Sequence, residues 1–202
     1  MLIKVLKELF HSELDKIYSK EEVFSFFHML CEAYLDKSRL ELALIPNLEL
    51  TPEQETLFLK ALEQLKRDFP IQYIIGNTEF MDLTFEVNEN VLIPRPETEE
   101  LIYWILESSS KEAKNSILDI GTGSGCIPIA LVKNLPNSII ETMDVSEKAL
   151  TVAKRNALAQ KVNIKFIHHD ILQLNDLDHD YDIIVSNPPY VRDSEKNEMH
   201  DN

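Results

Sequence analysis

The feature that most constrains this chain is an alternation of strand and helix patterns between Ser116 and Ser186. Short apolar runs typical of strands are separated by amphipathic runs typical of helices. We expect strands at 116–120, 138–143, 163–167 and 182–186, and helices at 126–134 and 147–160. Strands that are joined through helices pair in parallel and need helices on their faces. The pattern therefore predicts an α/β fold with a parallel sheet.

The first 70 residues have a different pattern, in which apolar side chains recur every three or four positions. Such stripes, at 2–17 and 23–34, are typical of helices that bury one face. A third helix is marked by Thr51 as its N-cap and Pro52 at its first position. We predict a small all-α domain over residues 1–70, in which the stripes form a packed core rather than a ligand groove.

A change of period after residue 70 marks a boundary. Residues 79–87 and 91–93 are rich in β-forming side chains and are separated by polar residues at 88–90, which indicates a hairpin. We assign residues 71–95 to a β-hairpin linker. Helical spacing then resumes, and residues 96–202 form the α/β domain.

Three of the four glycines in the chain lie together where the first strand of the alternation meets a helix. The loop is Gly121-Thr122-Gly123-Ser124-Gly125, and Asp119-Ile120 precedes it. Glycine permits a tight turn and close approach of a ligand, and the helix start offers unpaired N–H groups, so the loop predicts a nucleotide-like ligand. A dinucleotide fingerprint would need a glycine at position 126, which is Cys126, so a dinucleotide is disfavoured.

Acidic residues follow the next two strands. Asp144 lies 23 positions after Gly121, close to the roughly 20 that separate such a loop from a ribose-binding acid. Asp170 is placed to accept from an exocyclic amino group of adenine, and Ile171 to lie against the ring. Either aspartate alone could be a helix cap, but their series after the loop favours ligand binding.

The second motif, Asn187-Pro188-Pro189-Tyr190, directly follows the last strand. Ligands of open α/β sheets bind beyond the carboxyl ends of the strands, where the first and fourth strands flank the switch point, so we expect this motif to meet the glycine loop. Proline fixes the backbone and leaves carbonyl oxygens as acceptors, and the Asn187 side chain adds another. Such acceptors, with the flat face of Tyr190, suit a planar NH₂ group.

Together, the two motifs resemble the amino methyltransferases, which methylate a planar nitrogen of adenine, cytosine or a glutamine amide. The run Leu-Ile-Pro-Arg-Pro-Glu-Thr-Glu at 92–99, with Gly76 and Glu79-Phe80 before it and a helical domain upstream, is similar to the HemK/PrmC release factor glutamine methyltransferases. This resemblance extends from about residue 70 to residue 191.

The resemblance implies a Rossmann-like class I methyltransferase sheet and S-adenosyl-L-methionine as cofactor. It also implies that the methyl group goes to the glutamine of the Gly-Gly-Gln motif in peptide chain release factors, which the helical domain helps to dock. The expected cofactor-binding residues are Gly121, Thr122, Gly123, Ser124, Gly125, Asp144, Asp170, Ile171 and Asn187. The expected catalytic residues are Asn187, Pro188, Pro189 and Tyr190. Because the family's domain continues beyond this motif, we expect a sheet that is incomplete at the C-terminus, with the strand at 182–186 as an open edge.

Two alternatives stay open. One is a nucleic-acid amino methyltransferase acting on adenine, which would need a basic recognition surface. Residues 76–202 hold 11 basic and 22 acidic residues, and the whole chain has a net charge of −15, which disfavours that reading and any direct nucleic-acid partner. The other alternative is an inactive fragment that binds cofactor or release factor without turnover.

The sequence also leads to expectations about membrane association, cellular compartment, metal binding and oligomeric state. No stretch has the roughly 18 apolar residues of a membrane span. The two cysteines, Cys31 and Cys126, lie far apart, as is common in the reducing cytoplasm. His168 and His169 lack partners at metal-ligand spacing, so no metal site is expected. We predict a cytoplasmic monomer.

Overall fold

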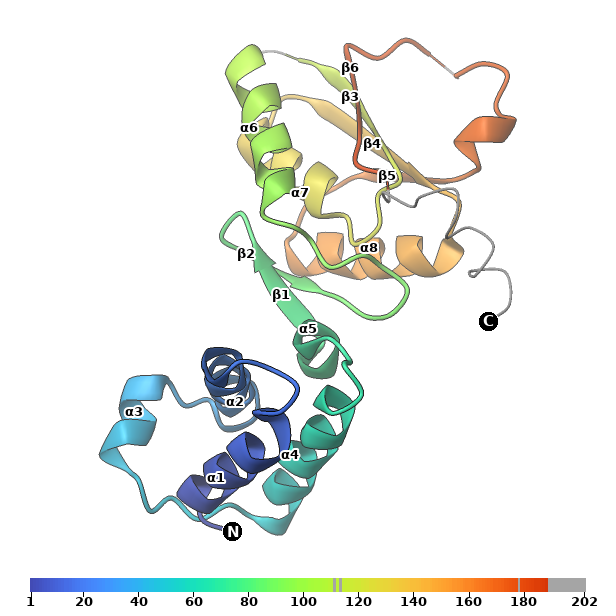
Figure 1. Ribbon diagram of the computed structural model, residues 1–202. Coiled ribbons are helices and arrows are strands. Elements are labelled where there is room, and N and C mark those ends of the chain that lie inside the picture. Colours follow the sequence, from blue (N-terminus) through green and yellow to red (C-terminus); the bar gives the residue numbers. More distant parts are fainter. Residues whose placement is uncertain (111, 113, 178, 189–202) are drawn as a thin grey trace. The chain divides into compact units, whose positions relative to one another are not determined.

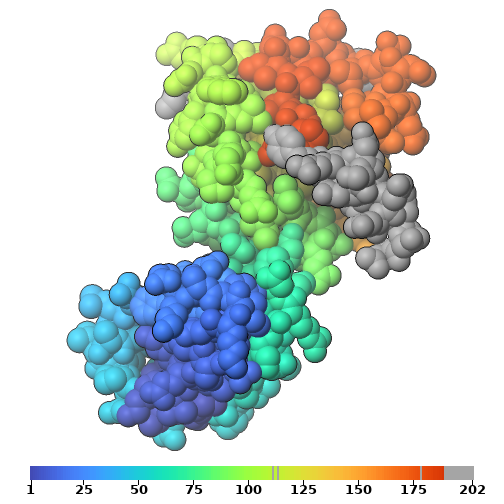
Figure 2. Space-filling view, in the orientation of Figure 1, coloured from blue at the N-terminus to red at the C-terminus, as the bar shows by residue number. Residues whose placement is uncertain are grey.

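The computed structural model describes residues 1–110, 112, 114–177 and 179–188. The chain forms two compact units, Met1–Gly76 and the residues from Asn77 onward. Figures 1 and 2 show both in the colours of the sequence. Each unit is described by itself.

The first unit is helical, as its apolar stripes predict. Its elements are α1 (Ile3–Leu14), α2 (Lys20–Leu35), α3 (Arg39–Leu44), α4 (Pro52–Leu65) and α5 (Ile71–Ile75). Capping boxes open α2, α3 and α4, and the one at α4 pairs Thr51 with Gln54. In each box a side-chain oxygen accepts from an otherwise unpaired backbone N–H, which fixes where the helix begins.

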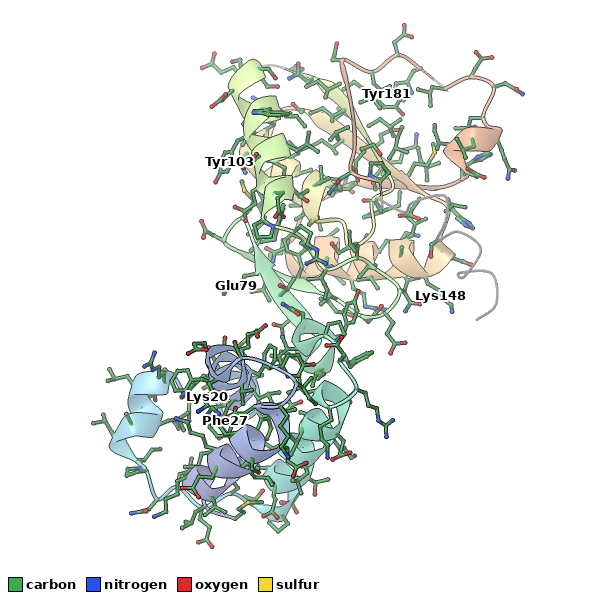
Figure 3. The ribbon with its side chains drawn as sticks, viewed as in Figure 1. Lys20, Phe27, Glu79, Tyr103, Lys148 and Tyr181 are labelled. Carbon is green, nitrogen blue, oxygen red and sulfur yellow. The ribbon has the colours of Figure 1, made fainter. Side chains whose placement is uncertain are left out.

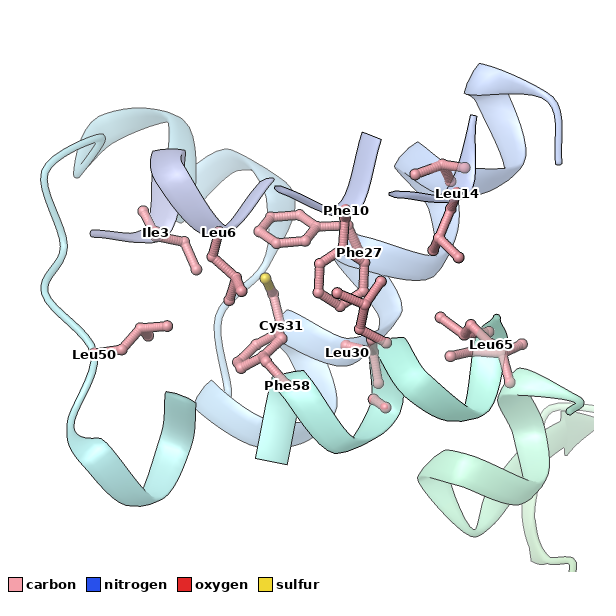
Figure 4. Packing of buried hydrophobic residues seen from close by; sticks show 14 of the residues in the cluster. Ile3, Leu6, Phe10, Leu14, Phe27, Leu30, Cys31, Leu50, Phe58 and Leu65 are labelled. Atoms are coloured by element: carbon pink, nitrogen blue, oxygen red, sulfur yellow. The ribbon is translucent and has the colours of Figure 1, made fainter. Parts of the chain in front are cut away.

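Aromatic side chains from different helices fill the core of this unit. Phe10 of α1 meets Phe27 of α2 edge to face, with 5.4 Å between the ring centroids, and Phe58 of α4 lies 6.1 Å from Phe27. All three rings are buried and lie together in the close view of Figure 4, and Figure 3 labels Phe27 within the helical unit. This packing joins α1, α2 and α4 and agrees with the predicted bundle core.

Two helices of this unit were not expected from the sequence. Helix α3 is short and begins at the Ser38 cap. Helix α5 covers Ile71–Ile75, which had been assigned to the linker, and Ile71 packs into the helical core. The helical unit therefore continues to Gly76, whose positive φ of 87° ends α5.

The hairpin is present, but its predicted turn at 88–90 is wrong. Strands β1 (Asn77–Phe80) and β2 (Leu83–Glu86) pair antiparallel around Met81 and Asp82. Both turn residues have positive φ, which matches the twist of a two-residue hairpin. Asn88 instead forms a separate local turn, in which its side chain accepts from the backbone N–H of Asn90 at 2.9 Å.

The predicted parallel sheet is confirmed. Strand β3 (Ser116–Ile120) lies between β4 (Ile139–Asp144) and β6 (Ile183–Ser186), and β5 (Lys165–His168) pairs with β4. Among the described residues the strand order is therefore β5-β4-β3-β6, with β6 at one edge. The chain leaves β3 toward β4 and returns to its other side with β6, which makes the end of β3 a switch point.

Helices surround this sheet (Figure 1). They are α6 (Glu97–Ser108), α7 (Cys126–Asn134) and α8 (Glu147–Ala159), and a 3₁₀ turn, η1 (Ile171–Gln173), follows β5. Helix α7 packs on α6, α8 and β4. Each connection brings the chain back so that the next strand also ends at the carboxyl edge of the sheet.

Replacing Phe58 by Ala should destabilise the helical unit by about 3–5 kcal/mol, because it removes a fully buried ring that contacts three neighbouring aromatic side chains. Leu57→Ala on the same helix is the matched control, since Leu57 is 44% exposed. Its cost should stay below about 1 kcal/mol. Urea denaturation followed by far-ultraviolet circular dichroism measures both, and equal losses would contradict the packing described.

Candidate functional site

The glycine loop joins the end of β3 to the start of α7. Gly121, Gly123 and Gly125 all have positive φ, at 78°, 55° and 81°, which side chains of other residues rarely allow. A Cβ on Gly125 would also lie 3.1 Å from the Cβ of Ala153 on α8. At Gly121 and Gly123 a Cβ would meet no described atom within 4 Å, so the loop borders open space.

Asp144 lies at the end of β4, directly beside this loop. Its Oδ2 accepts from the backbone N–H of Gly123 at 2.9 Å, and its Oδ1 accepts from that of Ser146 at 2.8 Å. A carboxylate oxygen can accept two hydrogen bonds, so each keeps capacity for a ribose hydroxyl. The structure thus brings the predicted ribose acid to the predicted loop.

Asp170 follows β5 and caps η1. Its Oδ1 accepts from the backbone N–H of Leu172 and its Oδ2 from the Gln173 side chain, both at 3.0 Å. The backbone N–H of His169 donates to the Asp144 carbonyl, which holds this segment beside the end of β4. Ile171 is half-buried in η1. Asp170 therefore caps η1 and lies just beyond the carboxyl end of β5.

Asp119 is a buried acid that the sequence motif contains but to which we assigned no role. Its side chain is fully buried, Thr142 donates to Oδ2 at 2.9 Å, and Oδ1 has no hydrogen-bond partner among the described residues. Burial raises the pKa of this carboxyl to about 6, although the hydroxyls of Thr122 and Thr142 oppose the rise. The sequence indicates a special role for Asp119, because a carboxylate inside an apolar strand is unusual.

Asn156 on α8 was missed by the sequence analysis. Its Nδ2 donates to the Ser124 carbonyl at 2.8 Å and to the Glu86 carbonyl at 3.0 Å, while its Oδ1 accepts from the Glu86 N–H at 2.7 Å. One buried amide thus ties the glycine loop to β2. The sequence could have indicated this role, because Asn156 is a polar residue on the otherwise apolar stripe of α8.

Asn187 follows β6 and is half-buried. Because β6 pairs with β3, with Ser186 opposite Ile120, Asn187 comes directly beside the start of the glycine loop. The Ser186 hydroxyl donates to the Ile120 carbonyl at 2.8 Å, which fixes the end of the strand. Pro188 is exposed, whereas Pro189 and Tyr190 lie outside the described residues.

A pocket of about 760 Å³ opens between α6 and the end of β6. Asn187 and Pro188 line it together with residues of the run 92–99, which contains Pro94-Arg95-Pro96. Its lining residues are Leu92, Arg95, Glu97, Thr98, Glu100, Leu101, Trp104, Ser186, Asn187 and Pro188. This size suits a side chain or a small ligand, and polar groups stand beside an apolar wall.

The acidic residues at the sheet edge decide what kind of nucleotide fits. Asp119, Asp144 and Asp170 stand in or just after three neighbouring strands, β3, β4 and β5. Phosphate groups would be repelled there. S-adenosylmethionine has no phosphate, carries ribose hydroxyls and an adenine amino group, and has a positive sulfur, so its chemistry fits this donor and acceptor set.

No group of three or more His, Cys, Asp or Glu side chains within the described ranges is arranged to hold a metal ion. None of the helices described is sufficiently long and apolar to cross a bilayer.

The chain matches two family models. The methyltransferase small domain matches residues 101–201, and the PrmC N-terminal domain matches residues 9–76. A solved ribosomal protein L11 methylase from Lactobacillus delbrueckii subsp. bulgaricus is 26% identical, with a TM-score of 0.43 over 50% of this chain and 51% of that one.

Curated relatives match over nearly the whole chain. The release factor glutamine methyltransferase of Flavobacterium psychrophilum is 51% identical over 100% of this chain and 72% of its own length. The enzyme of the same name from Bacteroides thetaiotaomicron is 38% identical over 94% of this chain and 68% of its own length.

These matches confirm the resemblance that the two motifs suggested, and with it the predicted cofactor class, S-adenosylmethionine. A PrmC N-terminal domain precedes a methyltransferase domain in this chain, and the similarity to the curated relatives covers both. The chain therefore belongs to the release factor glutamine methyltransferase family.

Proposed function

We propose that this chain transfers a methyl group from S-adenosylmethionine to the side-chain amide nitrogen of the glutamine in the Gly-Gly-Gln motif of peptide chain release factors. The observation that carries this proposal is the place of Asn187, which lies beside the glycine loop and lines the 760 Å³ pocket. The curated relatives bear the name of this activity.

The cofactor would be held along the carboxyl edge of the sheet. Gly121, Thr122, Gly123, Ser124 and Gly125 form the loop around it. Asp144 accepts from the ribose hydroxyls, Asp170 accepts from the adenine amino group, and Ile171 lies against the ring. Asn187 borders the reacting end. We add Asp119, whose unpartnered Oδ1 offers a negative charge to the cationic part of the ligand.

Catalysis rests on positioning a weak nucleophile. An amide nitrogen reacts poorly because its lone pair is delocalised into the carbonyl. The side-chain oxygen of Asn187 and the carbonyl of Pro188 accept the two N–H hydrogens, which orients the nitrogen and favours pyramidal geometry. Bound S-adenosylmethionine supplies the activated methyl group.

Alignment of this kind can contribute up to about 7–11 kcal/mol. The methylated nitrogen is acidic enough to lose its proton to water, so no strong general base is required. In this proposal Pro189 stiffens the corner and Tyr190 supplies a flat face against the substrate amide.

The helical unit would contribute to docking the protein substrate. It contains a cavity of about 360 Å³ between α1, α2 and α3, and two cations converge there on one ring. Lys7 Nζ lies 4.5 Å and Arg39 Cζ 4.7 Å from the centroid of Phe24, and the ion pairs within residues 1–76 include neither cation. Apolar surface with unpaired cations suits an acidic, partly apolar protein segment.

A nucleic-acid methyltransferase is less favoured than a protein methyltransferase. The PrmC N-terminal domain and the names of the relatives point to a protein substrate, and the net charge of −15 opposes a phosphate backbone. The monomeric state and the cytoplasmic location stay predictions.

The function itself is tested with radiolabelled S-adenosylmethionine, a release factor and duplex DNA. We expect label on the Gly-Gly-Gln glutamine alone. Asn187→Ala should lower this transfer at least about 100-fold, because one of the two acceptors is lost, while the cofactor Kd changes little. Label on DNA would support the adenine alternative. Cofactor binding without transfer to either would mean that this chain is an inactive binding fragment.

Asp144→Ala should weaken the binding of S-adenosylhomocysteine by about 10-fold to 100-fold, because a charged acceptor of two hydroxyl groups is removed. Glu147→Gln in the first turn of α8 is the matched control, since it also removes one carboxylate, three positions further along the chain and exposed. Isothermal titration calorimetry measures both. An unchanged Kd for Asp144→Ala would rule out the ribose assignment.

The affinity for S-adenosylmethionine should rise about tenfold between pH 5 and pH 7 and then level off. Burial raises the pKa of Asp119 to about 6, so at lower pH this carboxyl is protonated and must lose its proton before it attracts a cationic ligand. Asp119→Asn should bind more weakly and lose this dependence. If Asp119→Asn keeps the same pH profile, the dependence does not come from Asp119 and this assignment is wrong.

A further inference from the structure

Thr98 contacts the proposed catalytic asparagine from a distant part of the chain. It is the second residue of α6 and is 6% exposed, and it lines the same pocket as Asn187. Asn187 Nδ2 donates to Thr98 Oγ1 at 2.8 Å, across 89 positions of sequence. The sequence analysis gave Thr98 no role.

In the structure this bond places the NH₂ end of the Asn187 amide against Thr98. An asparagine side chain has an NH₂ at one end and an oxygen at the other, and only the oxygen can accept from a substrate NH₂. If the amide were reversed, the NH₂ of Asn187 would face the NH₂ of the substrate, and neither group could accept a hydrogen bond from the other. Because Thr98 Oγ1 accepts from Nδ2, the oxygen is turned to the opposite end of the amide.

Both partners of the bond are held in place. On one side, the Thr98 N–H donates to the Arg95 carbonyl at 3.0 Å, and Glu99 accepts from the Met81 N–H at 3.0 Å, which ties the start of α6 to the hairpin turn. On the other side, the Ser186 hydroxyl binds the end of β3. A contact between two anchored elements can keep one rotamer in place before the substrate binds.

The same contacts explain the run Pro94-Arg95-Pro96, which the mechanism otherwise leaves unused. Proline fixes φ, so the two prolines stiffen the approach to α6, and Pro96 stands at its N-cap. The stiff segment sets where the helix begins and therefore where Thr98 lies. A flexible linker would not fix a side chain to within hydrogen-bond distance of Asn187.

We propose that Thr98 is a positioning residue that holds the Asn187 amide with its oxygen toward the substrate nitrogen. This inference rests on the proposed function for its effect on catalysis. The orientation of the amide can also be measured without any substrate.

The first test is kinetic and uses three variants. Thr98→Val has the same shape but no acceptor, and we expect kcat to fall about tenfold. The Kd for S-adenosylhomocysteine and the melting temperature should match those of the unmodified protein. Thr98→Ser keeps the hydroxyl and should retain kcat within about threefold. Thr151→Val on α8 makes the same change outside the pocket and should leave kcat unchanged.

The second test observes the side-chain NH₂ resonances of Asn187 by nuclear magnetic resonance in the absence of release factor. They should shift in Thr98→Val and return toward their original position in Thr98→Ser. If they do so but the unmodified protein transfers no methyl group, the proposed function fails while the positioning role stands.

Four results would overturn the positioning role. They are unchanged Asn187 resonances in Thr98→Val, a kcat for this variant no lower than that of Thr151→Val, an equal loss of kcat in Thr98→Ser, and a loss that follows the melting temperature.

Discussion

The pairing of β3 with β4 on one side and β6 on the other is the constraint on which the site depends. Parallel strands all end at the same edge of a sheet, so residues that follow them meet even when they are far apart in the chain. In this way the loop after β3, Asp144 at the end of β4 and Asn187 after β6 come together. The register that aligns Ile120 with Ser186 puts Asn187 beside the glycine loop, as the proposed methyl transfer requires.

The charge at this edge supports the proposed ligand. Three carboxylates in or after neighbouring strands would repel a pyrophosphate, whereas a cationic nucleoside without phosphate is attracted. Asp119 shows that burying a carboxylate at this edge costs free energy. Its pKa is raised to about 6, and one of its oxygens lacks a partner among the described residues. A buried charge of this kind costs stability in the absence of ligand and is balanced by a cation.

Single polar side chains connect the elements around the site. Asn156 joins the glycine loop to β2 through three hydrogen bonds, and Thr98 joins α6 to Asn187 through one. Because the groups in these contacts are largely buried, each bond is sheltered from competition with water. The hairpin and the start of α6 are thus part of the scaffold that orients the site.

The sequence by itself determined the local features. The hydrophobic period predicted the parallel strands and the longer helices, but not the short helices α3 and α5. The capping pattern predicted the start of α4, and the glycine loop and Asn187-Pro188 marked the ends of β3 and β6. The hairpin turn was misplaced because Asn88 is a strong turn former, whereas Met81 and Asp82 adopt positive φ only in the context of the paired strands. The tertiary structure alone decided the contacts of Asn156 and Thr98. Their partners lie 70 and 89 positions away, and no local pattern encodes a hydrogen bond that forms only when distant elements pack together.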